Sequence, residues 1–300
     1  MNFQKPTALR PGATIAVVAP AGPAPDKRVE KGLSRLQSFG FKTKFYPYSE
    51  GPRRYLAGSD AERANNLLSA YNDSSNHAVW CLRGGFGSAR TLDCLDFEQF
   101  SAHPKPLIGF SDISALLLTL SSKLRQVTFH APVVTQMGDL PESTCTQVLD
   151  VLSGKQTQIS FLDDSKVYGN GSAEGPMMGG NLSVLCSLIG SNYFPDLDGA
   201  VLFLEDVAES PYRVDRMLTQ LRQNGVFDRI VGLALGDFGH ETEVELQSME
   251  SVWHEMASSF DGPIVSGLPC GHFEHNSCFP LGIRVRLDSA SNRLQFMESV

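Results

Sequence analysis

Long apolar runs and an excess of basic charge are absent from this 300-residue chain. No stretch of about 20 apolar residues is present to form a membrane-spanning helix. Residues 1–6 also lack the apolar stretch of a secretory signal. The 25 Lys and Arg residues are outnumbered by 33 Asp and Glu, which makes the net charge −8. This balance argues against nucleic acid or an anionic membrane as the partner, because both bind clustered basic residues. We therefore expect a cytoplasmic protein.

Cysteine pairs at metal-binding spacing are also absent. None of the six cysteines lies three residues from another, so the CxxC pattern of zinc knuckles and thioredoxin-type sites is missing. In a reducing cytoplasm we expect these thiols to fill the core, as the apolar neighbours of Cys81 indicate. Hydrophobic residues make up 42% and charged residues 19%, as in ordered globular proteins.

The order of apolar segments predicts two α/β domains. Strand-like runs at 14–19, 77–82 and 107–110 alternate with helical patterns, which is typical of a doubly wound, mainly parallel sheet. We assign this N-terminal domain to residues 1–155. Residues 156–175 are rich in Asp, Ser, Gly and Asn, and we interpret them as an interdomain link. Residues 176–300 then predict a smaller, mixed β/β/α domain.

Gly109-Phe110-Ser111-Asp112 lies between an apolar strand and a helical segment. A serine at such a turn is lifted from the sheet, where its hydroxyl can act as a nucleophile. The Asp112 amide could then donate a hydrogen bond to the oxyanion of an intermediate. The same serine could instead do no more than cap the helix.

A nucleophilic serine needs a base and an acid that orients the base. His272 and His275 share a loop after an apolar strand, and their positions alone do not separate them. Glu205 ends the apolar strand Val201-Leu202-Phe203-Leu204 and is the candidate acid, although a solvated acid at a strand end explains it equally well.

The glycine-rich segment Arg83-Gly84-Gly85-Phe86-Gly87 also follows a strand. Consecutive glycines allow a backbone to approach a ligand closely. The segment lacks both a Walker lysine and G-x-G-x-x-G, which weakens a phosphate-loop interpretation. It could supply a second oxyanion donor from the Gly85 amide, or it could be an ordinary tight turn.

Seven short motifs together carry a family resemblance, and they occur in this order: Tyr55-Leu56-Ala57-Gly58-Ser59-Asp60, Arg83-Gly84-Gly85-Phe86-Gly87, Gly109-Phe110-Ser111-Asp112-Ile113, Gly179-Gly180-Asn181-Leu182, Leu204-Glu205-Asp206, Tyr212-Arg213-Val214-Asp215-Arg216-Met217-Leu218, and Gly271-His272 with Pro280-Leu281-Gly282. Together they resemble the LD-carboxypeptidase family of serine peptidases, also called the S66 or muramoyltetrapeptide carboxypeptidase family. The resemblance extends from about Leu9 to the C-terminus.

The resemblance implies roles for individual residues. Ser111 matches the family nucleophile, Glu205 the acid and His272 the base, which favours His272 over His275. The family also implies an N-terminal domain like those of class I glutamine amidotransferases and a homodimeric assembly. No metal and no organic cofactor are implied. Arg83 and Arg213 are candidates for binding the terminal carboxylate of a substrate.

The activity implied is hydrolysis of the amide between meso-diaminopimelate and D-alanine in murein tetrapeptides during cell-wall recycling. An alternative is a microcin-immunity-type peptidase that cleaves an aminoacyl-nucleotide amide, although Trp80 and Trp253 lie in expected strand and helix rather than in a base-stacking loop. Two other hypotheses are a zinc hydrolase that uses Asp237, His240, His272 and His275, and a non-catalytic peptide-binding protein.

Overall fold

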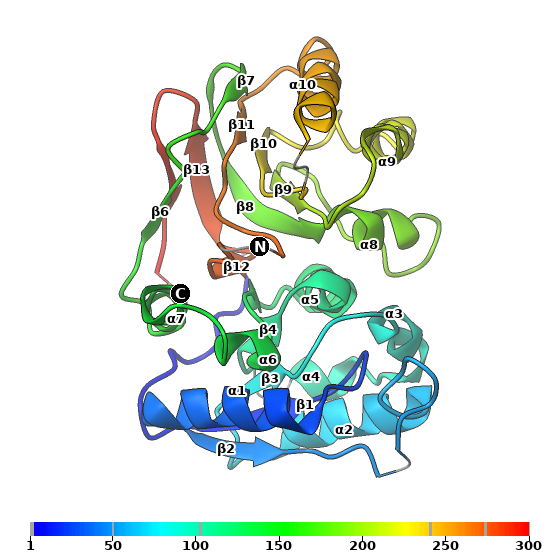
Figure 1. Ribbon diagram of the computed structural model, residues 1–300, viewed down its shortest axis with the longest axis vertical. Helices are drawn as coiled ribbons and strands as arrows, with labels where there is room; N and C mark the ends of the chain where they lie inside the picture. Colours follow the sequence, from blue (N-terminus) through cyan, green and yellow to red (C-terminus); the bar gives the residue numbers. More distant parts are fainter. Residues whose placement is uncertain (1–2, 50, 102–103, 240–241, 273–274, 300) are drawn as a thin grey trace. The chain divides into compact units, whose positions relative to one another are not determined.

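The alternation of strands and helices expected for the first half is present in the computed structural model (Figure 1). The structure describes residues 3–49, 51–101, 104–239, 242–272 and 275–299. The chain divides into two compact units, of which the first contains residues 1–155 and 277–281 and the second contains residues 156–276 and 282–299. Within the described residues, no helix is both long and apolar enough to span a bilayer.

The first unit is built on a six-stranded sheet with the strand order β12-β5-β4-β3-β1-β2. In that order the strands are Phe279–Leu281, Thr128–His130, Leu107–Gly109, Ala78–Cys81, Thr14–Val18 and Lys42–Phe45. All neighbours are parallel except β12, which runs antiparallel to β5. Strands β3 and β4 are fully buried, as expected for a parallel sheet with helices on both faces.

The helices of the first unit connect these strands. They are α1 Asp26–Ser38, α2 Asp60–Asn72, α3 Ser88–Thr91, α4 Glu98–Ser101, α5 Ser114–Leu124, α6 Val134–Met137 and α7 Glu142–Leu152, with two 3₁₀ turns, η1 Leu92–Cys94 and η2 Ser111–Ile113. Helix α2 is capped by Ser59, whose hydroxyl accepts the Glu62 N–H at 3.1 Å.

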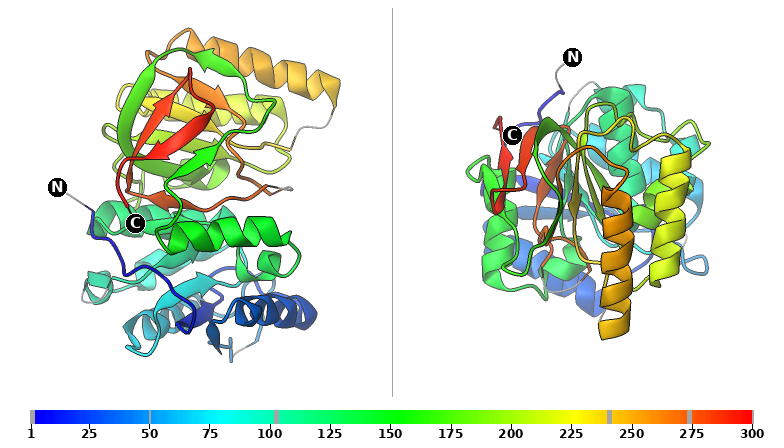
Figure 2. Two further views of the ribbon diagram at one scale, coloured as in Figure 1. Left: turned by 90° about the vertical axis from the view of Figure 1, so that its left-hand side faces the viewer. Right: turned by 90° about the horizontal axis from the view of Figure 1, so that it is seen from above.

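The second unit is built on a mixed eight-stranded sheet with the order β6-β14-β13-β8-β9-β10-β11-β7. In that order the strands are Gln158–Ser160, Arg293–Phe296, Arg284–Asp288, Ser172–Asn181, Val201–Glu205, Gly232–Leu235, Ile264–Ser266 and Val167–Gly169. Strands β8 to β11 are parallel, and the outer strands are antiparallel to their neighbours. Its helices are α8 Leu182–Ser187, α9 Pro211–Gln223 and α10 Glu243–Ala257, and α9 and α10 lie side by side (Figure 2).

The predicted α/β class, with a mainly parallel first sheet and a mixed second one, is confirmed. Residues 156–175, which the sequence indicates as a link, instead contain β6, β7 and the first residues of β8. Strands β6 and β7 are the two edges of their sheet and are partly exposed, so their polar composition resembles that of a loop. Residues 277–281, which we assign from sequence to the C-terminal domain, belong to the first unit because β12 pairs with β5.

The expectation that the cysteines fill the core is confirmed for five of the six, which are buried, free thiols. It is wrong for Cys94, which is exposed at the end of η1. Its neighbourhood in the sequence, Thr91-Leu92-Asp93-Cys94, carries less apolar context than that of Cys81.

Gly179 in β8 provides a test of the second sheet. Its φ is +133°, and a Cβ there would lie 1.9 Å from the Phe203 carbonyl oxygen, which β8–β9 pairing holds in place. We expect Gly179→Ala to lower the free energy of unfolding by about 3 kcal/mol or more, measured by urea unfolding.

Gly190→Ala is the matched control, because its φ is +83° but a Cβ would meet no atom of the described residues, beyond its chain neighbours, within 4 Å. It should cost only the strain of a left-handed alanine, about 1–2 kcal/mol. Equal losses in the two variants would contradict the packing argument.

Candidate functional site

The turn after β4 holds Ser111 in a strained conformation. Its φ is +61°, in the left-handed region that costs a residue with a side chain about 1–2 kcal/mol. The turn is tight as well, because a Cβ on Gly109 would lie 2.8 Å from Ile113 Cγ2 and 3.2 Å from Cys81 Cβ. Strain that the surrounding structure maintains at the carboxyl end of a parallel strand is characteristic of functional sites.

The glycine-rich loop after β3 passes directly beside this serine. A Cβ on Gly84 would lie 3.0 Å from Ser111 Cβ, 3.2 Å from Ser111 Oγ and 3.5 Å from the Asp112 amide nitrogen. Gly85, the next residue, has a φ of +103° and is exposed. The structure thus brings together Ser111, Asp112 and the Gly85 segment, all of which the sequence selects.

The Asp112 side chain links the serine turn to the end of that loop. It is buried, and its Oδ2 accepts the Ser88 backbone N–H at 2.8 Å, while the Ser88 hydroxyl donates to the Asp112 carbonyl oxygen. Burial raises the pKa of the Asp112 carboxyl, and hydrogen bonds from Ser88 and the Gly87 N–H oppose the rise.

The second unit contains a hydrogen-bonded acid–imidazole pair. Glu205, the last residue of β9, has a fully buried side chain, and its Oε2 lies 3.0 Å from Nδ1 of His272. The His272 side chain keeps 20% of its surface exposed. Burial raises the pKa of the Glu205 carboxyl, and the hydrogen bond to His272 opposes that rise. A buried carboxylate on Nδ1 directs Nε2 toward proton transfer.

The two histidines that sequence position leaves unseparated differ in the structure. His272 contacts the acid, whereas His275 is exposed. The geometry therefore favours His272 as the base, in agreement with the family resemblance.

A second buried carboxylate organises the surroundings of this pair. Asp206 accepts hydrogen bonds from the Asn181 side-chain amide at 3.0 Å and from the Ser183 and Val207 backbone N–H groups at 2.9 Å each. It therefore ties the end of β9 to the end of β8 and the start of α8. Asn181 in turn caps α8 by accepting the Val184 N–H.

Arg83 and Arg213, the candidates for carboxylate binding, lie on different units. Arg83 is exposed and donates to the Pro23 carbonyl oxygen at 2.7 Å. Arg213 is exposed on α9, where it contacts Glu209 and the Tyr212 hydroxyl. Their proposed role stays a prediction.

The residues of the zinc hypothesis do not form a recognisable cluster in the part of the chain that is described. Within the described residues, no group of three or more His, Cys, Asp or Glu side chains is arranged to hold a metal ion. His240, one member of the hypothetical set, lies outside the described residues.

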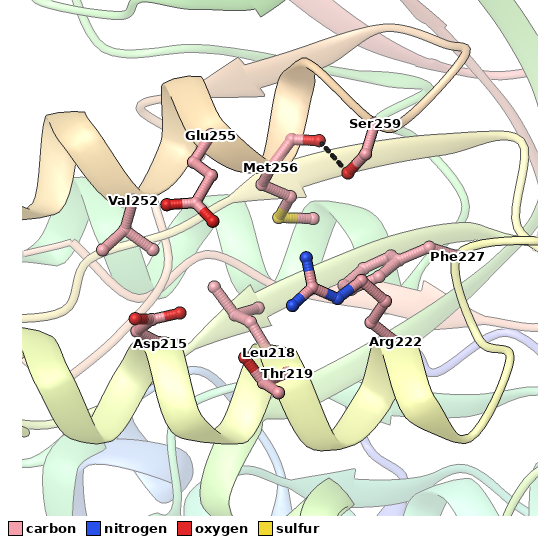
Figure 3. A pocket seen from close by; sticks show the side chains of 9 residues that line it. All are labelled: Asp215, Leu218, Thr219, Arg222, Phe227, Val252, Glu255, Met256 and Ser259. Carbon is pink, nitrogen blue, oxygen red and sulfur yellow. Dashed lines mark hydrogen bonds between the residues drawn. The ribbon is translucent and has the colours of Figure 1, made fainter.

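Two pockets of the second unit differ in size. Between α9 and α10, Arg222 and Glu255 point into a space of about 20 Å³, room for about one water (Figure 3). A larger pocket of about 460 Å³ adjoins Gly236, Asp237 and Gly267, beyond the carboxyl ends of β10 and β11. Ligands of α/β proteins bind at such strand ends, so of these two pockets the larger one has the size and position of a ligand site.

Sequence reasoning missed Arg63, Ser88 and the role of Asp206. Arg63 is 1% exposed, and its guanidinium donates to the Gly87 carbonyl oxygen at 2.7 Å and to the Pro20 carbonyl oxygen. A signal was present, because Arg63 shares a helical face with the buried Leu67 and Ala70. An arginine on an apolar helix face predicts a buried polar role.

Comparison with known proteins identifies both halves of the chain. The family description of the LD-carboxypeptidase N-terminal domain matches residues 15–131, and that of the LD-carboxypeptidase C-terminal domain matches residues 174–287. The resemblance inferred from the motifs is thereby confirmed.

Curated relatives and solved structures agree. The chain is 32% identical to a probable murein peptide carboxypeptidase of Bacillus subtilis, covering 97% of this chain and 93% of the relative. It is also 32% identical to the murein tetrapeptide carboxypeptidase of Pseudomonas aeruginosa, covering 94% of each. The crystal structure of an MccF-like protein from Bacillus anthracis superposes with a TM-score of 0.89 over 98% of this chain and 99% of that one. At 24% identity, this last likeness shows the fold alone.

Gly84→Ala tests whether the glycine loop must pass this close to the serine. The added Cβ would crowd Ser111 Cβ and Oγ, so we expect hydrolytic activity to fall by on the order of 100-fold or more. The rate at which a fluorophosphonate labels Ser111 should fall with it, and circular dichroism should show a folded protein.

Gly12→Ala controls for a general loss of stability, since Gly12 has a φ of +90° and an added methyl group would lie more than 4 Å from the atoms of every described residue beyond its chain neighbours. This variant should retain activity. Full activity in Gly84→Ala would show that the loop is not part of the reacting site.

Proposed function

Because the chain belongs to the LD-carboxypeptidase family and is a serine-type carboxypeptidase, we propose that it removes the terminal D-alanine from murein tetrapeptides. The bond cut is the amide between meso-diaminopimelate and D-alanine. The observation that carries the proposal is the hydrogen bond between His272 and the buried Glu205 carboxylate, since it supplies an oriented base in a family of carboxypeptidases.

Proton transfer in the proposed mechanism involves His272 and Ser111. Glu205 holds Nδ1 of the imidazole, so Nε2 is the nitrogen that takes the Ser111 proton as Oγ attacks the substrate carbonyl. The imidazolium then protonates the leaving amine of D-alanine. A water molecule, deprotonated by His272, attacks the acyl group, and the imidazolium returns that proton to Ser111 Oγ as the acyl–Oγ bond breaks.

Charge on the tetrahedral intermediate is assigned to two backbone donors. We assign its oxyanion to the N–H groups of Asp112 and Gly85. The nearness of the glycine loop to Ser111 and to the Asp112 amide nitrogen supports this assignment. Backbone donors that are already in place cost little reorganisation during the reaction.

The mechanism uses no metal and no organic cofactor. A cytoplasmic site of action, a part in cell-wall recycling and a homodimeric assembly stay predictions from the family resemblance. So do the roles of Arg83 and Arg213 toward the substrate carboxylate.

A second candidate function is cleavage of an aminoacyl-nucleotide amide. Trp80 and Trp253 are buried, so neither offers a stacking surface. However, the side chains of Tyr55 and Phe86 are 53% and 51% exposed, and Phe86 belongs to the glycine loop. Their rings form an edge-to-face pair with 5.6 Å between the ring centroids. Exposed aromatic rings can stack on a nucleobase. We favour the murein substrate because two relatives at 32% identity are named as a probable murein peptide carboxypeptidase and a murein tetrapeptide carboxypeptidase.

The substrate test uses L-Ala-D-Glu-meso-diaminopimelate-D-Ala, analysed by mass spectrometry. We expect release of D-alanine, and we expect Ser111→Ala to lower turnover by on the order of a millionfold while peptide binding persists. An acyl-sulfamoyl adenylate is assayed in parallel. Inactivity on the tetrapeptide together with cleavage of the adenylate would replace the proposal by the second function.

Glu205→Gln tests the acid separately. The amide keeps the size of the side chain but can hold the imidazole in the wrong tautomer, so kcat should fall by on the order of 10⁴-fold with KM little changed. Glu174→Gln, which removes a partly exposed ion pair with Arg284 in the same unit, should retain activity. Equal kcat values for the two variants would remove Glu205 from the mechanism.

A further inference from the structure

One peptide group of the glycine-rich loop is held from both sides by buried charged side chains. The peptide that joins Gly87 to Ser88 presents its carbonyl oxygen to Arg63 Nη1 at 2.7 Å and its N–H to Asp112 Oδ2 at 2.8 Å. Arg63 is 1% exposed and Asp112 is 5% exposed. We call this arrangement the Gly87–Ser88 clamp.

We propose that the Asp112 side chain is a positioning residue, which fixes the Gly84–Ser88 loop against the serine turn through the Gly87–Ser88 clamp. The clamp thereby sets the backbone N–H groups of Asp112 and Gly85 at the spacing that an oxyanion requires. This inference rests on the proposed serine mechanism.

The composition of the loop makes such an anchor necessary. Gly85 and Gly87 have φ values of +103° and +120°, and neither has a side chain whose packing could restrain the backbone. Phe86, which lies between them, is half exposed. At its start the loop is held by the bond from the Gly22 N–H to the Gly84 carbonyl oxygen at 3.1 Å. At its end it is held by the clamp. Gly85 lies between these anchors, so its N–H direction depends on both.

A carboxylate suits the Asp112 position because it has only acceptor atoms. It accepts the Ser88 N–H, and although burial raises the pKa of its carboxyl, the bonds from Ser88 and the Gly87 N–H limit that rise. The Arg63 guanidinium, which also pairs with Asp60, offsets part of the buried negative charge. Charge-assisted bonds to backbone groups are stronger than neutral ones, which favours a rigid loop.

Asp112→Asn separates positioning from simple electrostatics. Removing a negative charge beside a developing oxyanion should by itself raise the rate, because the charge repels the oxyanion. Replacing one acceptor by an amide donor should instead loosen the loop and lower the rate. The direction of the change in kcat therefore decides between the two effects.

The experiment measures kcat and KM for the tetrapeptide in the full chain. We expect Asp112→Asn to lower kcat by about 10- to 100-fold with KM within about threefold of its original value, as for partial loss of an oxyanion donor. Hydrogen exchange of the peptide that covers residues 83–90 should become faster. Asp139→Asn, which removes only exposed contacts to Lys31 and Arg28, is the control and should change neither quantity.

An unchanged or higher kcat in Asp112→Asn would overturn the inference. So would a lower kcat with unaltered exchange in residues 83–90. Should Asp112→Asn not fold, Arg63→Lys tests the other side of the clamp, because an ammonium cannot reproduce the guanidinium's bonds to Pro20, Gly87 and Asp60 together. It should show the same pattern, and normal kcat with normal exchange would overturn the inference.

Labelling of Ser111 by a fluorophosphonate keeps this test separate from the identity of the substrate. The reaction needs the nucleophile and the oxyanion donors but no peptide. If the original chain releases no D-alanine yet is labelled faster than Asp112→Asn, the proposed substrate fails and the clamp is supported. Equal labelling rates with normal D-alanine release would overturn the clamp and leave the proposed function in place.

Discussion

The left-handed backbone of Ser111 is the constraint on which the site depends. A serine at φ +61° is stable only if its neighbours prevent relaxation, and they do so by leaving no room. Gly109 packs against Ile113 and Cys81 on one side, and Gly84 passes within contact distance on the other. A Cβ on Gly109 or on Gly84 would crowd these neighbours, so both positions favour glycine. The strained turn leaves Ser111 partly exposed at the first residue of the 3₁₀ turn that leads into α5.

Each half of the proposed machinery has its own buried aspartate. Asp112 follows Ser111 and accepts the Ser88 N–H at the end of the glycine loop, and Asp206 follows Glu205 and accepts the N–H groups of Val207 and of Ser183 in the first turn of α8. Burying a carboxylate is costly unless such donors surround it, so these two positions are demanding ones in the fold. Asp112 thereby restrains a loop that has few packed side chains of its own, and Asp206 holds the ends of β8 and β9 and the start of α8 together. The contacts that orient the serine lie within the first unit, and those that orient the imidazole lie within the second.

The local sequence pattern predicted the elements that carry the chemistry, but not the long-range hydrogen bonds that hold these elements in place. The strand–turn–helix around Ser111, the glycine loop and the acid at the end of a strand were all visible as short motifs. The choice between His272 and His275 was not visible in the residues, because it depends on a hydrogen bond across 67 positions of sequence. Arg63 was missed because its bonds to the loop are to the carbonyl oxygens of Pro20 and Gly87, which any residue supplies and no motif records. Strands β6 and β7 were missed because edge strands need little apolar pattern.

The Gly87–Ser88 clamp also explains why a glycine-rich loop can serve as a rigid donor. Glycine lowers steric barriers and raises the entropy lost on ordering, so a bare Gly-Gly-Phe-Gly segment would sample many backbone states. Rigidity must then come from bonds to its peptide groups rather than from side-chain packing. A cation on the carbonyl oxygen and an anion on the N–H of one peptide polarise it in the same sense, so each bond strengthens the other. The pair of opposite charges thereby restrains the loop more than two neutral hydrogen bonds would, and leaves the Gly85 side open to a substrate.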